Sequence, residues 1–450
     1  MKYRFPLCFL TLLIFSFSAQ AQVQRINTIA GNGAEGFSGD GHSAFAAALF
    51  GPIGVAVDSA GNVYIDDYYN HRVRRVSAAT GIITTVAGNG EEGYSGDNSY
   101  GASAQVSPTG IAVDKKGNVF ISDAGHGVVR KLNMVDGIIT TVVGNGSWGH
   151  GGDSGSATAA SLRENLGLAF DNKGNLYIAD AGNHVVRKVD TAGIITTVAG
   201  DDTAGYSGDG AAATAAKLDS PIAVTVDSSG ALYITDFYNN VIRRVDTGII
   251  STYAGDNALP PGNSGNGGPA PAAQLNFPQG IATDNYGNLY ISDAGNNIIR
   301  RVDANGIITT VVGNGTAGFG GDLGYVDGAN LFNPYGIAVD YKGHIFIADA
   351  NNERVRETYY LSEGVKNVAQ NAAIDVHPNP FINEVGVTGL SKSDRVGVYD
   401  VAGRQMGDMF TVAQDGTNTF TINGLAAGIY MLQVWSSDGV QKAVVKMVKE

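Results

Sequence analysis

The sequence is poor in cysteine and in clustered basic charge, and both shortages exclude classes of function. Cys8 is the single cysteine among 450 residues, so no disulfide bond can form within the chain. The chain carries 29 Lys and Arg against 42 Asp and Glu, which gives a net charge of -13 without any Lys/Arg cluster. An acidic chain of this kind is a poor candidate for binding nucleic acid or anionic membrane surfaces. We therefore expect no nucleic-acid partner.

Sequence motifs of common enzymes are missing as well. No Gly-x-Ser-x-Gly elbow, phosphate-binding loop or dinucleotide fingerprint stands in a suitable strand–helix context. No His-x-His or His-x-x-x-His pair supplies the ligand spacing of a zinc site. We predict no catalytic residue, no metal ligand and no cofactor.

The N-terminus has an apolar run that is too short to span a bilayer. This run, Phe5–Phe17, follows Lys2 and Arg4 and precedes Ala19 and Ala21, which form a small-x-small cleavage site. The order is typical of a secretory signal peptide, and we expect cleavage after Ala21. Cys8 would be lost with it, and the mature chain is expected to have no transmembrane segment.

A unit of nearly constant length recurs six times. Each copy has one Asp, a second Asp nine residues later and an Arg seven residues after that. The steps between copies are 56, 57, 56, 57 and 56 residues, which indicates a repeat architecture. The first Asp is Asp58, Asp114, Asp171, Asp227, Asp284 and Asp340; the second is Asp67, Asp123, Asp180, Asp236, Asp293 and Asp349; the Arg is Arg74, Arg130, Arg187, Arg243, Arg300 and Arg356.

Each repeat contains four strand-like runs. In the fifth copy these are Gly280–Thr283, Leu289–Ser292, Ile298–Val302 and Gly306–Val312. Turns rich in Gly, Asn and Asp separate them, and such short runs exclude amphipathic helices. Four short antiparallel strands per unit, repeated radially, predict an all-β propeller.

The number of strands predicts how the ring closes. A fourth-strand run, Ile26–Ala30, precedes the first complete repeat, whereas the last repeat, from about Tyr335 to Thr358, has three strands. We expect Ile26–Ala30 to complete that last sheet. Six blades then close into a ring that has no open sheet edge.

The repeats resemble the NHL repeat. In the last copy Gly336–Asp340, Ile345–Asp349 and Arg354–Arg356 carry the resemblance, and the other five copies have matching runs. The resemblance covers Ile26 to Thr358, about three quarters of the chain. The family implies a six-bladed propeller, in agreement with the strand count. Its members include binding modules, sensor domains and a metal-dependent lyase, so it implies little about activity.

A different all-β pattern follows the repeats. Val396–Asp400, Thr419–Ile422, Gly428–Val434 and Ala443–Val448 are its clearest strands, and they predict a small β-sandwich.

This C-terminal region resembles the C-terminal sorting domain of the type IX secretion system. The matching residues are His377–Phe381, Val398–Asp400, Gly403 and Leu425–Tyr430. The resemblance implies a partner in that secretion machinery and a secreted or outer-cell-surface location. We predict a signal peptide at residues 1–21, a propeller at 22–358, a linker at 359–373 and the sorting domain at 374–450.

Residues present in every repeat are expected to be structural, because a functional site in a propeller is asymmetric. The second Asp is expected to cap a turn, within reach of the Arg on the adjacent strand. His71 and His184 share a slot with Asn240 and Asn297, which fits a turn residue better than a metal ligand, and His126 stands one position earlier. Long loops join successive blades and carry another series, Asp40, Asp97, Asp153, Asp209 and Asp322. We expect these residues to brace the loops rather than bind calcium, since EF-hand spacing is absent.

Departures from the repeat mark candidate ligand-binding residues. The long loops and the turns after the second Asp are expected on one face, here called the long-loop face. The candidates on it are Tyr68 and Tyr69 in blade 1, Trp148, His150 and Glu164 in blade 3, and Phe237 and Tyr238 in blade 4. We align Trp148 and His150 with the Tyr or Phe and the Ser of the other loops. Exposed aromatics suit sugar stacking or protein contact; the alternative is that they pack on their own loops.

Three hypotheses of function follow. The first is a secreted or surface-held module that binds a protein or a glycan through the long-loop face. The second is a metal-dependent lactonase- or lyase-type enzyme, which needs several carboxylate, Asn or His side chains converging on the central channel. The third is a mainly structural surface protein. The missing catalytic set favours the first.

Overall fold

The computed structural model describes residues 24–360, 376–377, 383–400, 406, 409–425, 428–437 and 441–449. The expected signal peptide, with its cleavage after Ala21, and residues 361–373 of the expected linker lie outside the described part of the chain.

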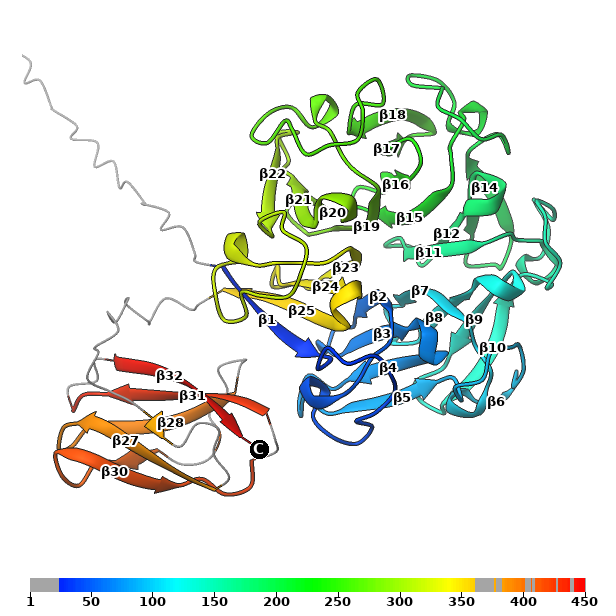
Figure 1. Ribbon diagram of the computed structural model, residues 1–450. Coiled ribbons are helices and arrows are strands. Elements are labelled where there is room, and N and C mark those ends of the chain that lie inside the picture. Colours follow the sequence, from blue (N-terminus) through cyan, green and yellow to red (C-terminus); the bar gives the residue numbers. More distant parts are fainter. Residues whose placement is uncertain are drawn as a thin grey trace, which may run out of the picture.

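Residues 24–360 fold into six antiparallel sheets of four main strands, arranged as blades around a central opening (Figure 1). Blade 1 consists of β2 (Pro52–Val57), β3 (Val63–Asp67), β4 (Arg72–Val76) and β5 (Ile83–Ala87). Blade 2 consists of β7 (Pro108–Val113), β8 (Val119–Asp123), β9 (Val128–Leu132) and β10 (Ile138–Val143), with β6 (Ser99–Tyr100) at its outer edge. Blade 3 consists of β11 (Asn165–Phe170), β12 (Leu176–Asp180), β13 (Val185–Val189) and β14 (Ile195–Ala199).

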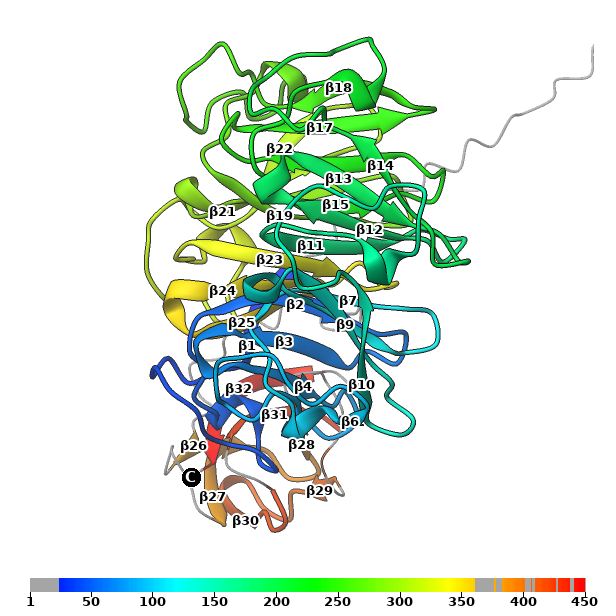
Figure 2. The same cartoon turned by 90° about the vertical axis from the view of Figure 1, so that its right-hand side faces the viewer.

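The remaining blades repeat this order, and the ring is seen from its side in Figure 2. Blade 4 consists of β15 (Pro221–Val226), β16 (Leu232–Asp236), β17 (Val241–Asp246) and β18 (Ile249–Ala254). Blade 5 consists of β19 (Pro278–Thr283), β20 (Leu289–Asp293), β21 (Ile298–Val302) and β22 (Ile308–Val312). Blade 6 consists of β23 (Pro334–Val339), β24 (Ile345–Asp349), β25 (Arg354–Tyr360) and β1 (Gln24–Ala30).

The ring closes through the strand that begins the described chain, as predicted. β1 pairs antiparallel with β25, so that Ile26 lies opposite Thr358 and Thr28 opposite Arg356. Side chains reinforce the pairing, because Gln24 Nε2 donates to Thr358 Oγ1 at 2.8 Å. Thr28 Oγ1 donates to Asp322 Oδ2 of a long loop at 2.7 Å. β1 therefore supplies the outer strand that completes the last sheet.

The middle of each second strand supplies the core between blades. One Ile in each is fully buried: Ile65, Ile121, Ile178, Ile234, Ile291 and Ile347. Burying such a side chain contributes about 1.5–3 kcal/mol. Side chains alternate between the two faces of a strand, and this Ile stands at the same position of the second strand in every blade. The core is consequently divided into similar clusters between neighbouring blades.

Each long loop is anchored by small apolar residues. The loop before blade 1 contains the 3-10 helix η1 (Ala44–Ala46), and it buries Ala44, Ala47 and Leu49. Gly39 has a φ of 88°, and a Cβ atom there would lie 2.6 Å from Cβ of Ala47. Only glycine allows the loop to fold back this closely. Equivalent 3-10 helices are η3 (Gly101–Ser103), η5 (Ala157–Ala159), η7 (Ala213–Ala215), η8 (Ala270–Ala272) and η10 (Val326–Gly328).

The turn after each second strand forms a second series of 3-10 helices in five blades. These are η2 (Tyr68–Asn70), η4 (Ala124–His126), η6 (Ala181–Asn183), η9 (Ala294–Asn296) and η11 (Ala350–Asn352). The residue after each of them adopts the left-handed conformation.

The C-terminal residues form a small β-sandwich, as predicted. One sheet has the order β26 (Val376–His377), β27 (Glu384–Leu390) and β30 (Gly416–Thr421). The other has the order β29 (Phe410–Thr411), β28 (Arg395–Asp400), β31 (Gly428–Trp435) and β32 (Gln441–Lys449). Val385, Val387, Val396 and Leu432 are buried in one apolar cluster formed by both sheets. The structure of residues 24–449, where described, is therefore all-β.

Candidate functional site

The second Asp and the Arg that recur in each repeat form a buried brace on the long-loop face. Arg243 Nη1 lies 3.3 Å from Asp236 Oδ2, and both side chains are fully buried. Arg243 Nη2 also lies 2.7 Å from Asp209 Oδ1 of the long loop. Asp236 Oδ1 accepts the backbone N–H of Asp219 at 2.7 Å. One Arg therefore ties the turn, the strand and the loop together, and the predicted bracing role of the loop Asp is borne out in this geometry.

The brace is completed by the aromatic residue of the loop. The guanidinium carbon of Arg243 lies 4.9 Å from the ring centre of Tyr206. Tyr206 OH is 2.7 Å from Thr252 Oγ1. Such cation–π contacts contribute about 0.5–2 kcal/mol, so the ring holds the loop on the blade. Phe37, Tyr94 and Phe319 stand over Arg residues in the same way.

The turns after the second strands lie against the long loops, as predicted. Asn70 Nδ2 donates to Gly36 O of the loop and to Asp67 Oδ1, both at 2.8 Å. The corresponding Asn183, Asn239, Asn296 and Asn352 make the same loop contact. Loops and turns therefore form one surface.

The slot shared by His and Asn links neighbouring blades. His184 has a φ of 55°, and its Nδ1 accepts the backbone N–H of Ser220 at 3.1 Å. Asn240 Oδ1 accepts the N–H of Phe277 in the next blade at 2.8 Å. His and Asn both occur at this turn position because each can accept a backbone N–H from the next blade.

The aromatic residues predicted in blades 1 and 4 lie on this surface in two clusters. Tyr69 is 58% exposed, and its ring centre lies 4.7 Å from Phe50 and 4.8 Å from Tyr68. In blade 4 the ring of Phe237 lies 4.9 Å from Tyr238, which is 60% exposed. Tyr68 and Phe237 are half-buried against these partners. Both alternatives expected for these aromatics therefore occur: one ring of each pair packs against its neighbours, and the other is exposed to solvent.

Phe50 and Phe277 are members of these clusters that sequence reasoning missed. Phe277 stands 5.5 Å from Phe237 and has a φ of 47°, a conformation that costs a bulky residue of order 1–3 kcal/mol. Both residues come shortly before the Pro that begins an inner strand. An aromatic residue just before that Pro is the signal that could have identified them.

The alignment of Trp148 with the loop aromatics, made from the sequence, was wrong, and the contacts of the third loop correct it. His150, not Trp148, takes the place of the loop aromatic, because His150 Nε2 lies 2.9 Å from Thr197 Oγ1 as Tyr206 OH does from Thr252. Trp148 is an additional side chain, 60% exposed. Glu164 is also exposed, with a left-handed φ of 50°. Trp148 lies beside Gly127 of blade 2, whereas the two Tyr/Phe clusters are centred on Tyr69 of blade 1 and Tyr238 of blade 4.

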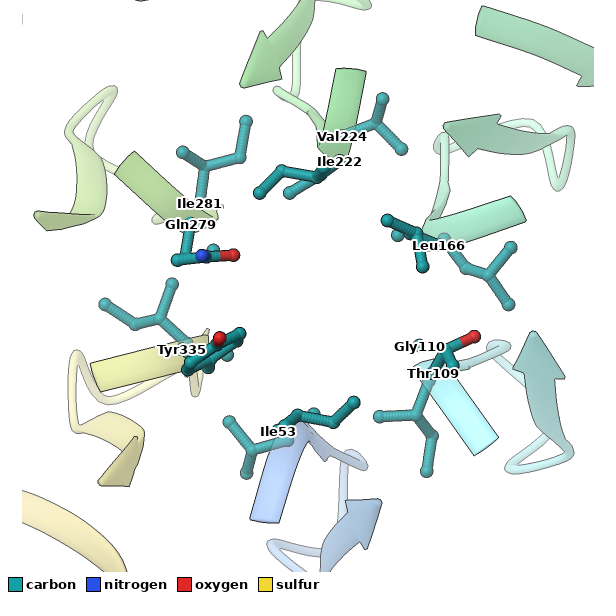
Figure 3. A pocket seen from close by; sticks show the side chains of 18 residues that line it. Ile53, Thr109, Gly110, Leu166, Ile222, Val224, Gln279, Ile281 and Tyr335 are labelled. Carbon is teal, nitrogen blue, oxygen red and sulfur yellow. The ribbon is translucent and has the colours of Figure 1, made fainter. Parts of the chain in front are cut away.

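The central channel does not have the residues that a metal-dependent enzyme would require. A cavity of about 170 Å³ on the axis is lined by the inner strands, with Ile53, Leu166, Ile222, Thr109, Gln279 and Tyr335 around its opening (Figure 3). No carboxylate or imidazole is among its lining residues. No group of three His, Cys, Asp or Glu that could hold a metal occurs in the described chain. The residues present do not fit the metal of a lactonase or lyase.

On the opposite face, the β23–β24 turn contains a charged histidine. His344 Nδ1 lies 3.3 Å from both Asp340 Oδ2 and Glu357 Oε1. Hydrogen bonds to these two carboxylates raise the pKa of His344 to about 9. The added stability is complete below pH 6.5, the unfolded pKa, and is lost as pH rises through 9.

We expect His344→Asn to lower the free energy of unfolding by about 1–2 kcal/mol at pH 6 and by little at pH 10. Asn occupies this turn position in four other repeats, so the variant should keep the turn. Urea unfolding across this pH range measures the effect. A difference in the free energy of unfolding that is the same at all pH values would contradict the ion pairs of His344 with Asp340 and Glu357.

Comparisons with known families agree with this geometry. The model of the NHL repeat matches residues 51–76, and that of the teneurin NHL domain matches residues 146–207 and 254–319. The model of the secretion system C-terminal sorting domain matches residues 375–450. Both parts of the chain are thus matched by a family description.

Curated relatives are similar over most of the chain. Protein SUPPRESSOR OF QUENCHING 1, chloroplastic, of Arabidopsis thaliana is 30% identical over 319 residues, which cover 67% of this chain and 30% of that protein. Teneurin-1 of Homo sapiens is 25% identical over 480 residues, which cover 93% of this chain and 17% of that protein. The chain therefore spans less than a third of the length of these relatives.

Solved structures share the fold. A Bacteroides thetaiotaomicron structural genomics protein of unknown function has a TM-score of 0.56 at 20% identity, covering 75% of this chain and 76% of that one. An auxiliary nutrient binding protein from Bacteroides ovatus has a TM-score of 0.55 at 16% identity, covering 75% of this chain and 77% of that one. At this identity the likeness shows the fold alone.

Proposed function

We propose that this protein, an NHL-repeat six-bladed β-propeller followed by a type IX secretion system C-terminal sorting domain, binds a protein or glycan ligand through its long-loop face. The sorting domain directs the protein to the outside of the cell or to the cell surface. Within the described residues, no helix has the length and apolar character needed to cross a membrane. Because the sorting domain directs the protein there, the ligand would be met outside the cell.

The observation that carries the proposal is the pair of aromatic clusters on braced loops. Tyr69 and Tyr238 are exposed, while their half-buried neighbours Tyr68 and Phe237 contact them edge to face. Buried Arg braces hold the surrounding loops, so little conformational entropy would be lost when a ligand binds. Rigid, exposed aromatic rings are the side chains that contribute most to recognition.

Other properties support binding over catalysis. The channel lining offers neither a carboxylate nor an imidazole for general acid–base work. The Bacteroides ovatus propeller is named as a nutrient binding protein, and a binding role is in keeping with that name. We therefore favour a binding module over an enzyme.

The double variant Tyr69→Ala/Tyr238→Ala is expected to lose about tenfold or more in affinity, because hot-spot aromatics typically contribute 2 kcal/mol or more. A glycan array and a pull-down from the medium that surrounds the cells give the readouts. Tyr286→Ala/Tyr341→Ala is the matched control, since these exposed tyrosines lie in turns on the opposite face. Equal binding by the double variant and the wild type would rule out the long-loop face.

A further inference from the structure

The turn of blade 2 departs from the repeat at a histidine. His126 occupies the position where the five other blades have Asn, whose amide ties the turn to the long loop. Its Nδ1 lies 2.7 Å from Asp123 Oδ1, and the Asp123 side chain is fully buried. In neutral His126 the Nδ1–H donates to this carboxylate, which leaves Nε2 as an acceptor. Nε2 makes no hydrogen bond among the described residues, and 29% of the side chain is exposed.

The residue that follows His126 also breaks the pattern. Gly127 has no side chain, whereas the other blades have His, Asn or Glu in this slot, and four of these accept an N–H from the next blade. At the junction of blades 2 and 3 this bond is missing. The indole of Trp148 lies there instead, with Cδ1 3.4 Å from where a Cβ of Gly127 would be. The exposed ring of Trp148 therefore lies against Gly127, in the slot where the other blades have a longer side chain.

A second aromatic ring is fixed beside the imidazole. The ring of Tyr94 is stacked on His126, with centroids 5.6 Å apart and planes at 28°. Tyr94 OH lies 2.7 Å from Thr141 Oγ1, and its ring faces the guanidinium of Arg130. Tyr94 therefore holds the imidazole from one side while the buried carboxylate of Asp123 sets its rotation.

We propose that Trp148 and His126 form a subsite for a neutral sugar ring, with Tyr94 and Asp123 as positioning residues. The exposed indole face would pack on the C–H face of a hexose, and Nε2 would accept a hydrogen bond from a sugar hydroxyl. The protein has a net charge of -13, which disfavours an anionic sugar. This subsite rests on the proposed function, of which it selects the glycan alternative, but it shares no residue with the Tyr69 and Tyr238 clusters.

Two variants test the subsite without disturbing the fold. His126→Asn introduces the residue of the five other blades, and Trp148→Ala introduces the residue that blades 4 and 6 have at Ala204 and Ala317. The probes are neutral cello-, xylo-, manno- and malto-oligosaccharides, presented to the full chain on an array and then titrated calorimetrically. We expect each variant to lower the affinity for the bound sugar by about tenfold, which corresponds to 1.4 kcal/mol.

A fluorescence measurement reports on Trp148 directly. The chain has two tryptophans, Trp148 and Trp435, so Trp435→Phe leaves Trp148 as the single indole. We expect a blue shift of its emission when the sugar binds, because stacking removes water from the ring.

The outcomes separate this subsite from the wider proposal. Loss of sugar binding in His126→Asn and Trp148→Ala, with binding kept in Tyr69→Ala/Tyr238→Ala, would support it. Sugar binding that neither variant weakens would overturn the subsite. Failure of all neutral sugars to bind would also overturn it, and a protein captured through Tyr69 and Tyr238 would then leave the proposed function standing.

Discussion

Asp66→Ser is expected to stabilise the protein by about 3 kcal/mol at pH 8, an unusual gain for a single substitution. Asp66 lies on β3 and is fully buried, and neither carboxylate oxygen has a hydrogen-bond partner among the described residues. Burial raises its pKa to about 8. At two of the five corresponding positions Ser122 Oγ donates to Leu166 O at 2.6 Å and Thr235 Oγ1 to Gln279 O at 2.8 Å, each on the inner strand of the next blade. A serine at residue 66 would supply the hydroxyl that those blades use.

The effect of this substitution should depend strongly on pH. The folded pKa of about 8 lies above the unfolded value of 3.8, so the folded chain holds a proton that the unfolded chain releases. Wild-type stability therefore falls as pH rises from 4 to 8, by an upper limit of about 1.4 kcal/mol per unit, and stops falling above 8. The variant should lack this dependence. Urea unfolding of both proteins between pH 4.5 and pH 9 measures this dependence, and about five pH values define the slope of the free energy of unfolding against pH.

Ser122→Ala serves as the control for this prediction. It removes the hydroxyl bridge to Leu166 without a titrating group, so it should cost about 1 kcal/mol at every pH. Parallel stability curves for wild type and Asp66→Ser would show that Asp66 is not held protonated by burial.

The sequence predicted the ring because the evidence for it is periodic. Six repeats in phase, with Ile26–Ala30 left over before them and a strand missing after them, admit one closure, and β1 pairs with β25 accordingly. The constant spacing likewise marked the Asp–Arg pairs as structural. Asp66 gave no such signal, because it precedes Asp67 and looks like one more polar residue of the turn. Its burial depends on the neighbouring blade, which local sequence does not describe.

The candidate site was predicted only in part, for a similar reason. Tyr69 and Tyr238 stand out because the other blades have small residues or Asn at their positions. Phe50 and Phe277 join them only after the turn packs on the loop that enters the inner strand. The glycine-rich loop of blade 3 allowed two alignments of Trp148 and His150, and the hydrogen bond of His150 to Thr197 decides between them.

Arg243→Met is expected to lower the free energy of unfolding by about 3–5 kcal/mol, the usual cost of leaving a buried charge without its partner. The variant would strand Asp236, which is fully buried, and would release Asp209 of the long loop. Burial already raises the pKa of Asp236 to about 6 with the Arg present. Urea unfolding at pH 7.5 measures the loss, and hydrogen exchange should show opening of residues 205–218 in particular. A loss below about 1 kcal/mol would mean that the brace contributes little net stability.

Blade 5 provides the matched comparison, because its brace is incomplete in the wild type. Asn266 replaces the loop Asp, Arg300 Nη2 has no hydrogen-bond partner among the described residues, and burial lowers the pKa of Arg300. Arg300→Met should therefore cost less than Arg243→Met. Asn266→Asp should stabilise the protein by about 1–2 kcal/mol, because it supplies the missing carboxylate. It can keep the existing bond from Thr310 N to its side-chain oxygen, as Asp153 does with Thr197 N. If Asn266→Asp is neutral while Arg243→Met is costly, the loop carboxylate adds nothing, and the stability of each brace comes from the strand-end Asp alone.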